Sequence, residues 1–152
     1  MGNALARTLL RLAGPTLIGA GGAAWYVITR ELKAQKIEVH PDSPSLQGRP
    51  VAGPVTAFAQ AAVMEKHALA IGGGRTFAEI SEEWIEATEA GDEERAAELS
   101  GTRETVMQAN LLRASLFTSV LAYGVSALTM GVGVLSCATA SVTRTPRAAR
   151  KH

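Results

Sequence analysis

The sequence predicts a mainly α fold, with two transmembrane helices joined by a largely helical extracytoplasmic domain that contains a candidate short strand. Three observations predict it: two long windows without charged side chains, acidic residues confined to the segment between them, and helix signals within that segment. The predicted parts are a cytoplasmic tail (1–11), a first span (12–29), an extracytoplasmic domain (30–112), a second span (113–143) and a basic cytoplasmic tail (144–152).

The two uncharged windows are long enough to cross a bilayer. Eighteen residues between Arg11 and Arg30, and thirty between Arg113 and Arg144, include no Asp, Glu, Lys, Arg or His. As helices they would reach roughly 27 Å and 45 Å, against a hydrocarbon core of about 30 Å. Because the backbone must satisfy its own hydrogen bonds in lipid, both windows are predicted as transmembrane helices.

The first window has a second interpretation as a cleaved secretion signal. Arg7 and Arg11 would form its positive region, and residues 22–24 resemble a small-residue cleavage site. The apolar run continues beyond that site, however, and its aromatic and basic flank is typical of a helix retained in the membrane. We therefore favour a retained anchor, with three residues at the membrane interface: Trp25, Tyr26 and Arg30.

Charge predicts the orientation of the chain. Residues 30–112 carry all fourteen acidic side chains and eight basic ones, a net charge of −6, whereas both tails carry only basic side chains. Short basic flanks stay on the cytoplasmic side of a membrane, while long loops cross largely regardless of charge. We expect a two-pass protein of the cell membrane with both termini in the cytoplasm. The lipid bilayer is its expected partner, and nucleic acid is not.

The first part of the central domain combines a strand-like stretch with a helix. "KIEVH" alternates polar and apolar side chains, so residues 36–40 are the candidate strand. Four prolines and two glycines exclude regular helix from residues 41–54, which are predicted as an irregular connector. Residues 55–70 follow a helical pattern and end at the glycines 72–74. The polar face of this predicted helix carries Thr56, Gln60 and His67.

The second part of the domain is also predicted to be helical. A T-x-x-E capping box at residues 76–79 begins a helix that ends near Gly91. Residues 79–98 hold nine acids against a single base, which we interpret as a solvated face. After the cap-like Ser-Gly-Thr at residues 100–102, a further helix is expected to start near Arg103 and to continue into the second span.

Few residues of the sequence are candidates for a catalytic or metal-binding site. His40 and His67 are the two histidines of the predicted extracytoplasmic domain, and an iron site of two histidines and one carboxylate would need both of them with Glu38 or Glu65. We interpret His67 as a surface histidine and Cys137, the only cysteine, as a small packing residue. Phosphate-binding and nucleophile motifs are missing from the sequence. We expect no catalytic, cofactor-binding or metal site.

Small residues in both windows predict close helix packing. We expect the two spans to pack on each other, with a homo-oligomer or docking to a larger membrane complex as the alternative. The residues predicted to pack are Ala20 and Ala24 in the first span, and Gly124, Ala127 and Gly131 in the second.

Several stretches together resemble a known family. They are a span ending in "WYV", the "IEV" stretch, "VAGPVTAFAQAAVMEKHAL", "GGRTFAE" and "TVMQANLLRASLFTSVLAYGV". As a set they resemble small actinobacterial two-span membrane proteins that are often labelled aromatic ring-opening dioxygenases. The resemblance implies two spans, and the label implies cleavage of an aromatic ring.

The residues and the resemblance lead to one functional expectation and one alternative. We expect an integral membrane protein with a structural or accessory role in the bacterial cell envelope, acting through helix packing or protein partners. The alternative is a membrane-tethered non-haem iron dioxygenase that opens aromatic rings.

Overall fold

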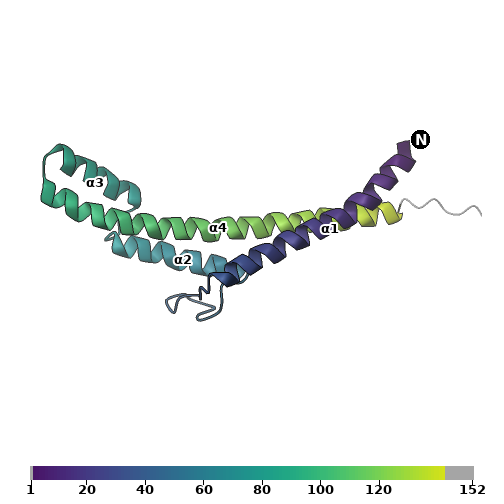
Figure 1. Ribbon diagram of the computed structural model, residues 1–152, viewed down its shortest axis with the longest axis horizontal. Helices are drawn as coiled ribbons and strands as arrows, with labels where there is room; N and C mark the ends of the chain where they lie inside the picture. The colour runs from purple at the N-terminus through teal and green to yellow at the C-terminus, as the bar shows by residue number, and fades with distance from the viewer. Residues whose placement is uncertain (1, 143–152) are drawn as a thin grey trace, which may run out of the picture. The chain divides into compact units, whose positions relative to one another are not determined.

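The computed structural model describes residues 2–142, which form four helices in chain order (Figure 1). These are α1 (Gly2–Ala34), α2 (Pro54–Ile71), α3 (Phe77–Glu89) and α4 (Glu93–Val142). The prediction of a mainly α fold is confirmed. The predicted basic tail, residues 144–152, lies outside the described residues, as does the last residue of the predicted second span.

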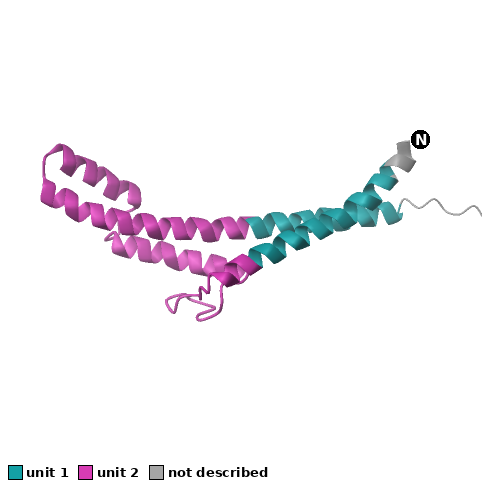
Figure 2. Cartoon of the chain, in the orientation of Figure 1, with its two compact units in different colours: residues 1–29, 122–152 teal, residues 30–121 magenta. Residues whose placement is uncertain are grey.

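The chain divides into two compact units that share α1 and α4 (Figure 2). Unit 1 comprises residues 1–29 and 122–152, and unit 2 comprises residues 30–121. Unit 1 holds the first predicted span and much of the second. Unit 2 holds α2, α3 and the loop between α1 and α2.

Among the described residues, α4 is the one helix long and apolar enough to cross a membrane, and only 17% of its most apolar window is buried. The second predicted span therefore lies in a helix of the required length and composition. The first predicted span lies in α1, which is not apolar enough to meet the same criterion for a membrane-spanning helix. Pro15 falls in the interior of α1 rather than at its start, so the carbonyl of Arg11 lacks the usual N–H donor four residues on.

Local signals explain where α2 begins and ends. Pro54 occupies its first turn, where a missing N–H costs little, and the Thr56 hydroxyl accepts hydrogen bonds from the backbone N–H groups of Ala52 and Gly53. Gly72 caps the other end, and Gly74, with φ of 84°, turns the chain toward α3. The predicted helix over residues 55–70 is confirmed to within one residue at each end.

The predicted capping box begins α3. The Glu79 N–H donates to the Thr76 hydroxyl at 3.3 Å, and the Thr76 N–H donates to the Glu79 carboxylate at 2.7 Å. The backbone hydrogen bond from Thr76, reinforced by its hydroxyl, lowers the pKa of Glu79. Because that pKa is lowered, the contact stabilises the helix above the ordinary carboxyl pKa and is lost as the pH falls through the lowered value.

The helix predicted to start near Arg103 starts ten residues earlier, and the cap proposed at residues 100–102 is wrong. The Asp92 carboxylate accepts a hydrogen bond from the Arg95 N–H at 3.0 Å and so caps α4. Gly101 lies inside the helix. A single interior glycine weakens a helix by only about 1 kcal/mol, and neighbouring packing overcomes that cost here.

The candidate strand is reduced to an isolated antiparallel bridge between Glu38 and Pro50, and no strand occurs between residues 2 and 142. Val39 donates to the Arg49 carbonyl at 2.9 Å, and Val51 donates to the Ile37 carbonyl at 2.8 Å. Pro50 has no N–H to extend the pairing. The prediction of an irregular connector over residues 41–54 agrees with the structure up to the start of α2.

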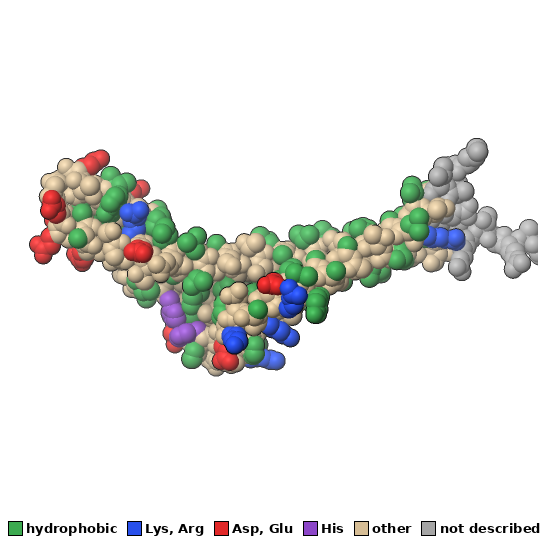
Figure 3. All heavy atoms as spheres, viewed as in Figure 1, with side chains coloured by type: hydrophobic (Ala, Val, Ile, Leu, Met, Phe, Trp, Pro, Cys, Tyr) green, Lys and Arg blue, Asp and Glu red, His purple; other side chains and the backbone are tan. Residues whose placement is uncertain are grey.

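The core of unit 2 lies where α3 packs on α2 and α4. Ile80, Leu99 and Val106 are at most 2% exposed there, and Phe77 and Trp84 pack against them. The acidic side chains gather on the surface around α3 and the start of α4, as expected (Figure 3). The same acidic segment nevertheless supplies Ile80 and Ala87 to the core, because an amphipathic helix turns one face inward.

Candidate functional site

Close backbone approach joins α1 to α4 within unit 1. A Cβ atom built on Gly133 would lie 2.7 Å from the Gly14 carbonyl oxygen and 2.8 Å from Ile18 Cγ1. A Cβ on Gly21 would lie 2.7 Å from the Ser126 carbonyl oxygen. Separations this short admit only glycine, so these glycines let the two backbones meet. We call this contact the glycine seam: Gly14 and Gly21 on α1, against Ser126, Met130, Gly133 and Cys137 on α4.

The residues predicted to pack the helices lie on the other side. A Cβ atom on Gly124 or Gly131 would meet no atom within 4 Å. On α4 the residues that face α1 recur every three or four positions, at 123, 126, 130, 133, 137 and 140, and this phase excludes position 131. The structure therefore places all five predicted packing residues on the exposed surface: Ala20, Ala24, Gly124, Ala127 and Gly131.

Bulky apolar side chains cover the outside of unit 1. Leu12 is 66% exposed, Leu128 and Leu135 are each 67% exposed, and hydrophobic side chains are visible along the length of the unit (Figure 3). Small and weakly polar residues occupy the inside. The exposed large apolar residues of the unit are Leu9, Leu12, Ile18, Tyr26, Val27, Val125, Leu128, Val132, Val134, Leu135 and Val142.

A buried hydroxyl pair lies at one end of the glycine seam. Tyr123 is 1% exposed, and its hydroxyl lies 2.7 Å from the Thr29 hydroxyl. Thr29 donates its own proton to the Trp25 carbonyl at 2.9 Å, so Tyr123 is the donor to Thr29. Both hydroxyls are thereby satisfied without water.

The predicted interface anchors differ in their surroundings. Trp25 packs edge-on against Tyr123, with ring centroids 4.6 Å apart. Tyr26 projects outward and is 66% exposed. Arg30 forms an exposed ion pair with the neighbouring Glu31 at 2.9 Å.

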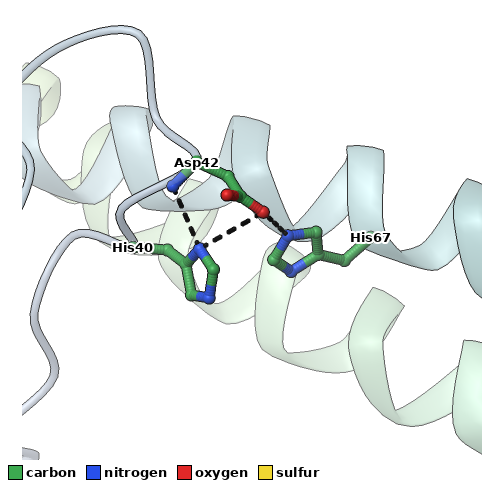
Figure 4. A group of neighbouring side chains, drawn as sticks. All are labelled: His40, Asp42 and His67. Carbon is green, nitrogen blue, oxygen red and sulfur yellow. Dashed lines mark hydrogen bonds and ion pairs between the residues drawn. The ribbon is translucent and has the colours of Figure 1, made fainter.

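A second feature, in unit 2, brings both histidines of the central segment to one carboxylate (Figure 4). His67 Nε2 lies 2.9 Å from Asp42 Oδ2, and His40 Nδ1 lies 3.6 Å from the same oxygen. The two imidazole rings meet edge to face, with centroids 4.6 Å apart. We call this group the His-Asp-His cluster: His40, Asp42 and His67.

The polar face of α2 positions this cluster. The side chain of Gln60 accepts a hydrogen bond from the His40 N–H at 2.9 Å, and His67 reaches Asp42 two turns further along the helix. Thr56 holds the end of the same loop through Ala52 and Gly53. The polar face predicted from the sequence is therefore the face on which the loop docks, and Gln60 is buried there.

The hydrogen bond from His67 lowers the pKa of Asp42, and the charges of His40, His67 and Lys66 act in the same direction. The Asp42 N–H also donates to His40 Nδ1 at 3.2 Å, which assigns the ring proton of neutral His40 to Nε2. The cluster therefore presents a carboxylate beside an imidazole lone pair.

The carboxylate of the cluster is not one that the sequence suggested. Glu65 pairs with Arg113 at 3.0 Å, and Glu38 is the residue whose backbone bridges to Pro50. Asp42 takes their place because it follows His40 by two residues in a turn, which brings its carboxylate back to the ring. The sequence feature that indicates this arrangement is the His-Pro-Asp spacing of residues 40–42.

Comparisons of the chain with protein-family models, curated proteins and solved structures give no match.

Proposed function

We propose that this chain is a two-span membrane protein in which the α1–α4 hairpin of unit 1 anchors an extracytoplasmic, mainly helical domain, with a structural or accessory role in the bacterial cell envelope. The observation that carries the proposal is the inverted surface of unit 1. Large apolar side chains such as Leu128 and Leu135 face outward, while the glycines of the seam, Ser126 and the Tyr123 hydroxyl face inward.

Lipid explains this arrangement better than water does. Apolar side chains spread along two helices would be an aggregation hazard in water, whereas in a bilayer they contact hydrocarbon at no cost. Helices in lipid associate through close packing of small residues, which the glycine seam provides. The outward apolar side chains and the glycine seam also support a spanning role for α1, although α1 is less apolar than α4.

Charge supports the proposed orientation. The residues of unit 2 include all fourteen acids, and the flanks of the two predicted spans are basic. Unit 2 also contains a packed helical core, so it has the material to act as a domain. The resemblance to small two-span membrane proteins agrees with this proposal, and the role through helix packing or protein partners follows from it.

Reporter fusions test the topology. Fusions at residues 3 and 150 are expected to report the cytoplasm, and a fusion at residue 90 the opposite side, because positive flanks remain inside. A cytoplasmic signal from position 90 would overturn the orientation. A mature N-terminus near Trp25 would show instead that the first window is a cleaved signal.

The ring-opening dioxygenase is a second candidate because two histidines and one carboxylate are the ligand set of many non-haem iron oxygenases. Such an enzyme also needs a site for its aromatic substrate. A cavity of about 350 Å³ in unit 2 is lined by residues such as Phe77, Val106 and Arg113, and by none of the His-Asp-His cluster. An aromatic substrate in this cavity would not meet the cluster, which supports the accessory role.

Metal analysis separates the two candidates. Protein purified in mild detergent after growth with iron is expected to contain far less than one iron per chain, because the accessory role needs none. Stoichiometric iron together with oxygen-dependent loss of a catechol would favour the dioxygenase and reject the accessory role.

A further inference from the structure

We infer that the His-Asp-His cluster is a binding site for a divalent transition metal ion, with Zn²⁺ the ion that its donors fit best. This site goes beyond the proposed anchoring role, which needs no metal. It is built entirely within unit 2, from a loop and one helix.

The donor atoms already surround a common point. One ligand atom from each of the three side chains lies within 4.8 Å of the other two, and two of the separations involving Asp42 Oδ2 are 2.9 and 3.6 Å. In a tetrahedral site with ligands about 2.0 Å from Zn²⁺, neighbouring ligand atoms are about 3.3 Å apart. Small rotations of partly exposed side chains would close the three donors onto one ion.

The protonation pattern also suits a metal. A ligating histidine must offer a lone pair, and His40 Nδ1 already offers one, which accepts the Asp42 N–H and lies 3.6 Å from Asp42 Oδ2. An ion would displace that 3.2 Å hydrogen bond and the shorter one between His67 and Asp42, and the His67 proton would move from Nε2 to Nδ1 or be released to solvent. The exchange replaces two hydrogen bonds with three coordination bonds.

The site is held in place before any ion arrives. Gln60, 7% exposed, fixes the backbone of His40 to α2, and Val39 beside it is 1% exposed. Ser43 is 2% exposed, and its N–H donates to the His40 carbonyl at 3.0 Å. Little ordering of the loop remains to oppose binding.

The donor atoms of the cluster select the class of ion, and the exposure of the cluster leaves a fourth coordination position open. The side chains of His40, Asp42 and His67 are 43%, 52% and 29% exposed, so water can complete the coordination. Two nitrogens and one oxygen with an open fourth position match Zn²⁺, whereas Ca²⁺ and Mg²⁺ prefer oxygen ligands alone.

Zinc titration of the full chain tests the inference. The tag-free protein is purified in detergent, treated with a chelator, dialysed and titrated with ZnCl₂ in a calorimeter. We expect one Zn²⁺ per chain, and we expect His67→Gln and Asp42→Asn each to weaken binding by at least about tenfold, because each removes one of three ligands. His152→Gln, at the third histidine of the chain, is the matched control and should bind as the wild type does.

Hydrogen exchange provides a second measurement of zinc binding that does not depend on calorimetry. Zn²⁺ should slow exchange of the amides in residues 40–48 in the wild type and leave it unchanged in His67→Gln. Far-UV circular dichroism confirms that each variant keeps its helices. Binding that is absent in the wild type, or that His152→Gln weakens as much as His67→Gln does, would overturn the site and leave the His67–Asp42 hydrogen bond as a simple loop contact.

Discussion

Replacing Gly133 by isoleucine is expected to open the α1–α4 hairpin of unit 1, whereas the same replacement at Gly131 should leave it closed. A Cβ at position 133 would meet the Gly14 carbonyl oxygen at 2.7 Å and the Ile18 backbone nitrogen at 2.9 Å. Overpacking typically lowers the free energy of unfolding by about 1–3 kcal/mol. The cost should lie at or above the upper end here, because the clashing atoms belong to the backbone and cannot rotate away as a side chain can.

The single thiol of the chain reports this opening. Cys137 lies against Gly14 in the glycine seam, so separation of the helices exposes its sulfur. We expect N-ethylmaleimide to alkylate Cys137 faster in Gly133→Ile than in the wild type, in detergent micelles. Gly131→Ile is the control, because a Cβ at that position meets no atom within 4 Å. Equal alkylation rates in the two variants would contradict the seam.

Truncating Ile80 to alanine is expected to lower the free energy of unfolding of unit 2 by about 2–5 kcal/mol, the usual cost of deleting a buried isoleucine side chain. Ile80 is 0% exposed and lies in the core with Leu99 and Val106. Ile85, on the same helix, is 47% exposed, and Ile85→Ala should cost much less.

Urea unfolding followed by the fluorescence of Trp84 measures both variants. The sequence holds two tryptophans, so a Trp25→Phe background leaves Trp84, which packs against this core, as the only reporter. A shift of the midpoint for Ile85→Ala as large as that for Ile80→Ala would mean that α3 does not pack through the face containing Ile80.

Local chemistry made the ends of α2 and α3 predictable from the sequence. Gly72 and Gly74 stop one helix, and the Thr76–Glu79 capping box starts the next, through contacts between residues close in the chain. The start of α4 is not predictable in the same way, because Ser100 and Gly101 resemble a helix cap. Both are exposed, and the helix continues through them because Leu99 and Val106 on either side pack into the core, each at most 2% exposed.

Contacts between distant residues were not predictable in the same way. Small residues occur on several faces of α4, so their spacing alone could not distinguish Gly131 from Gly133. The sequence suggests His40 and His67 as a pair and points to Glu38 or Glu65 as the third ligand, whereas the structure places Asp42 there. Nothing in the helical pattern of α2 indicated that Gln60 would hold the backbone of His40 and bring Asp42 to His67.

The hydrogen bond between Thr29 and Tyr123 joins residues 94 positions apart, and the whole glycine seam depends on similarly distant segments. Contacts so remote in the chain form late, because a long loop must close first. During synthesis α1 emerges long before its partner, while α2 and α3 are completed in between. The helix α1 must therefore persist without its partner until the distal part of α4 has been made, so the seam forms after α2 and α3 are complete.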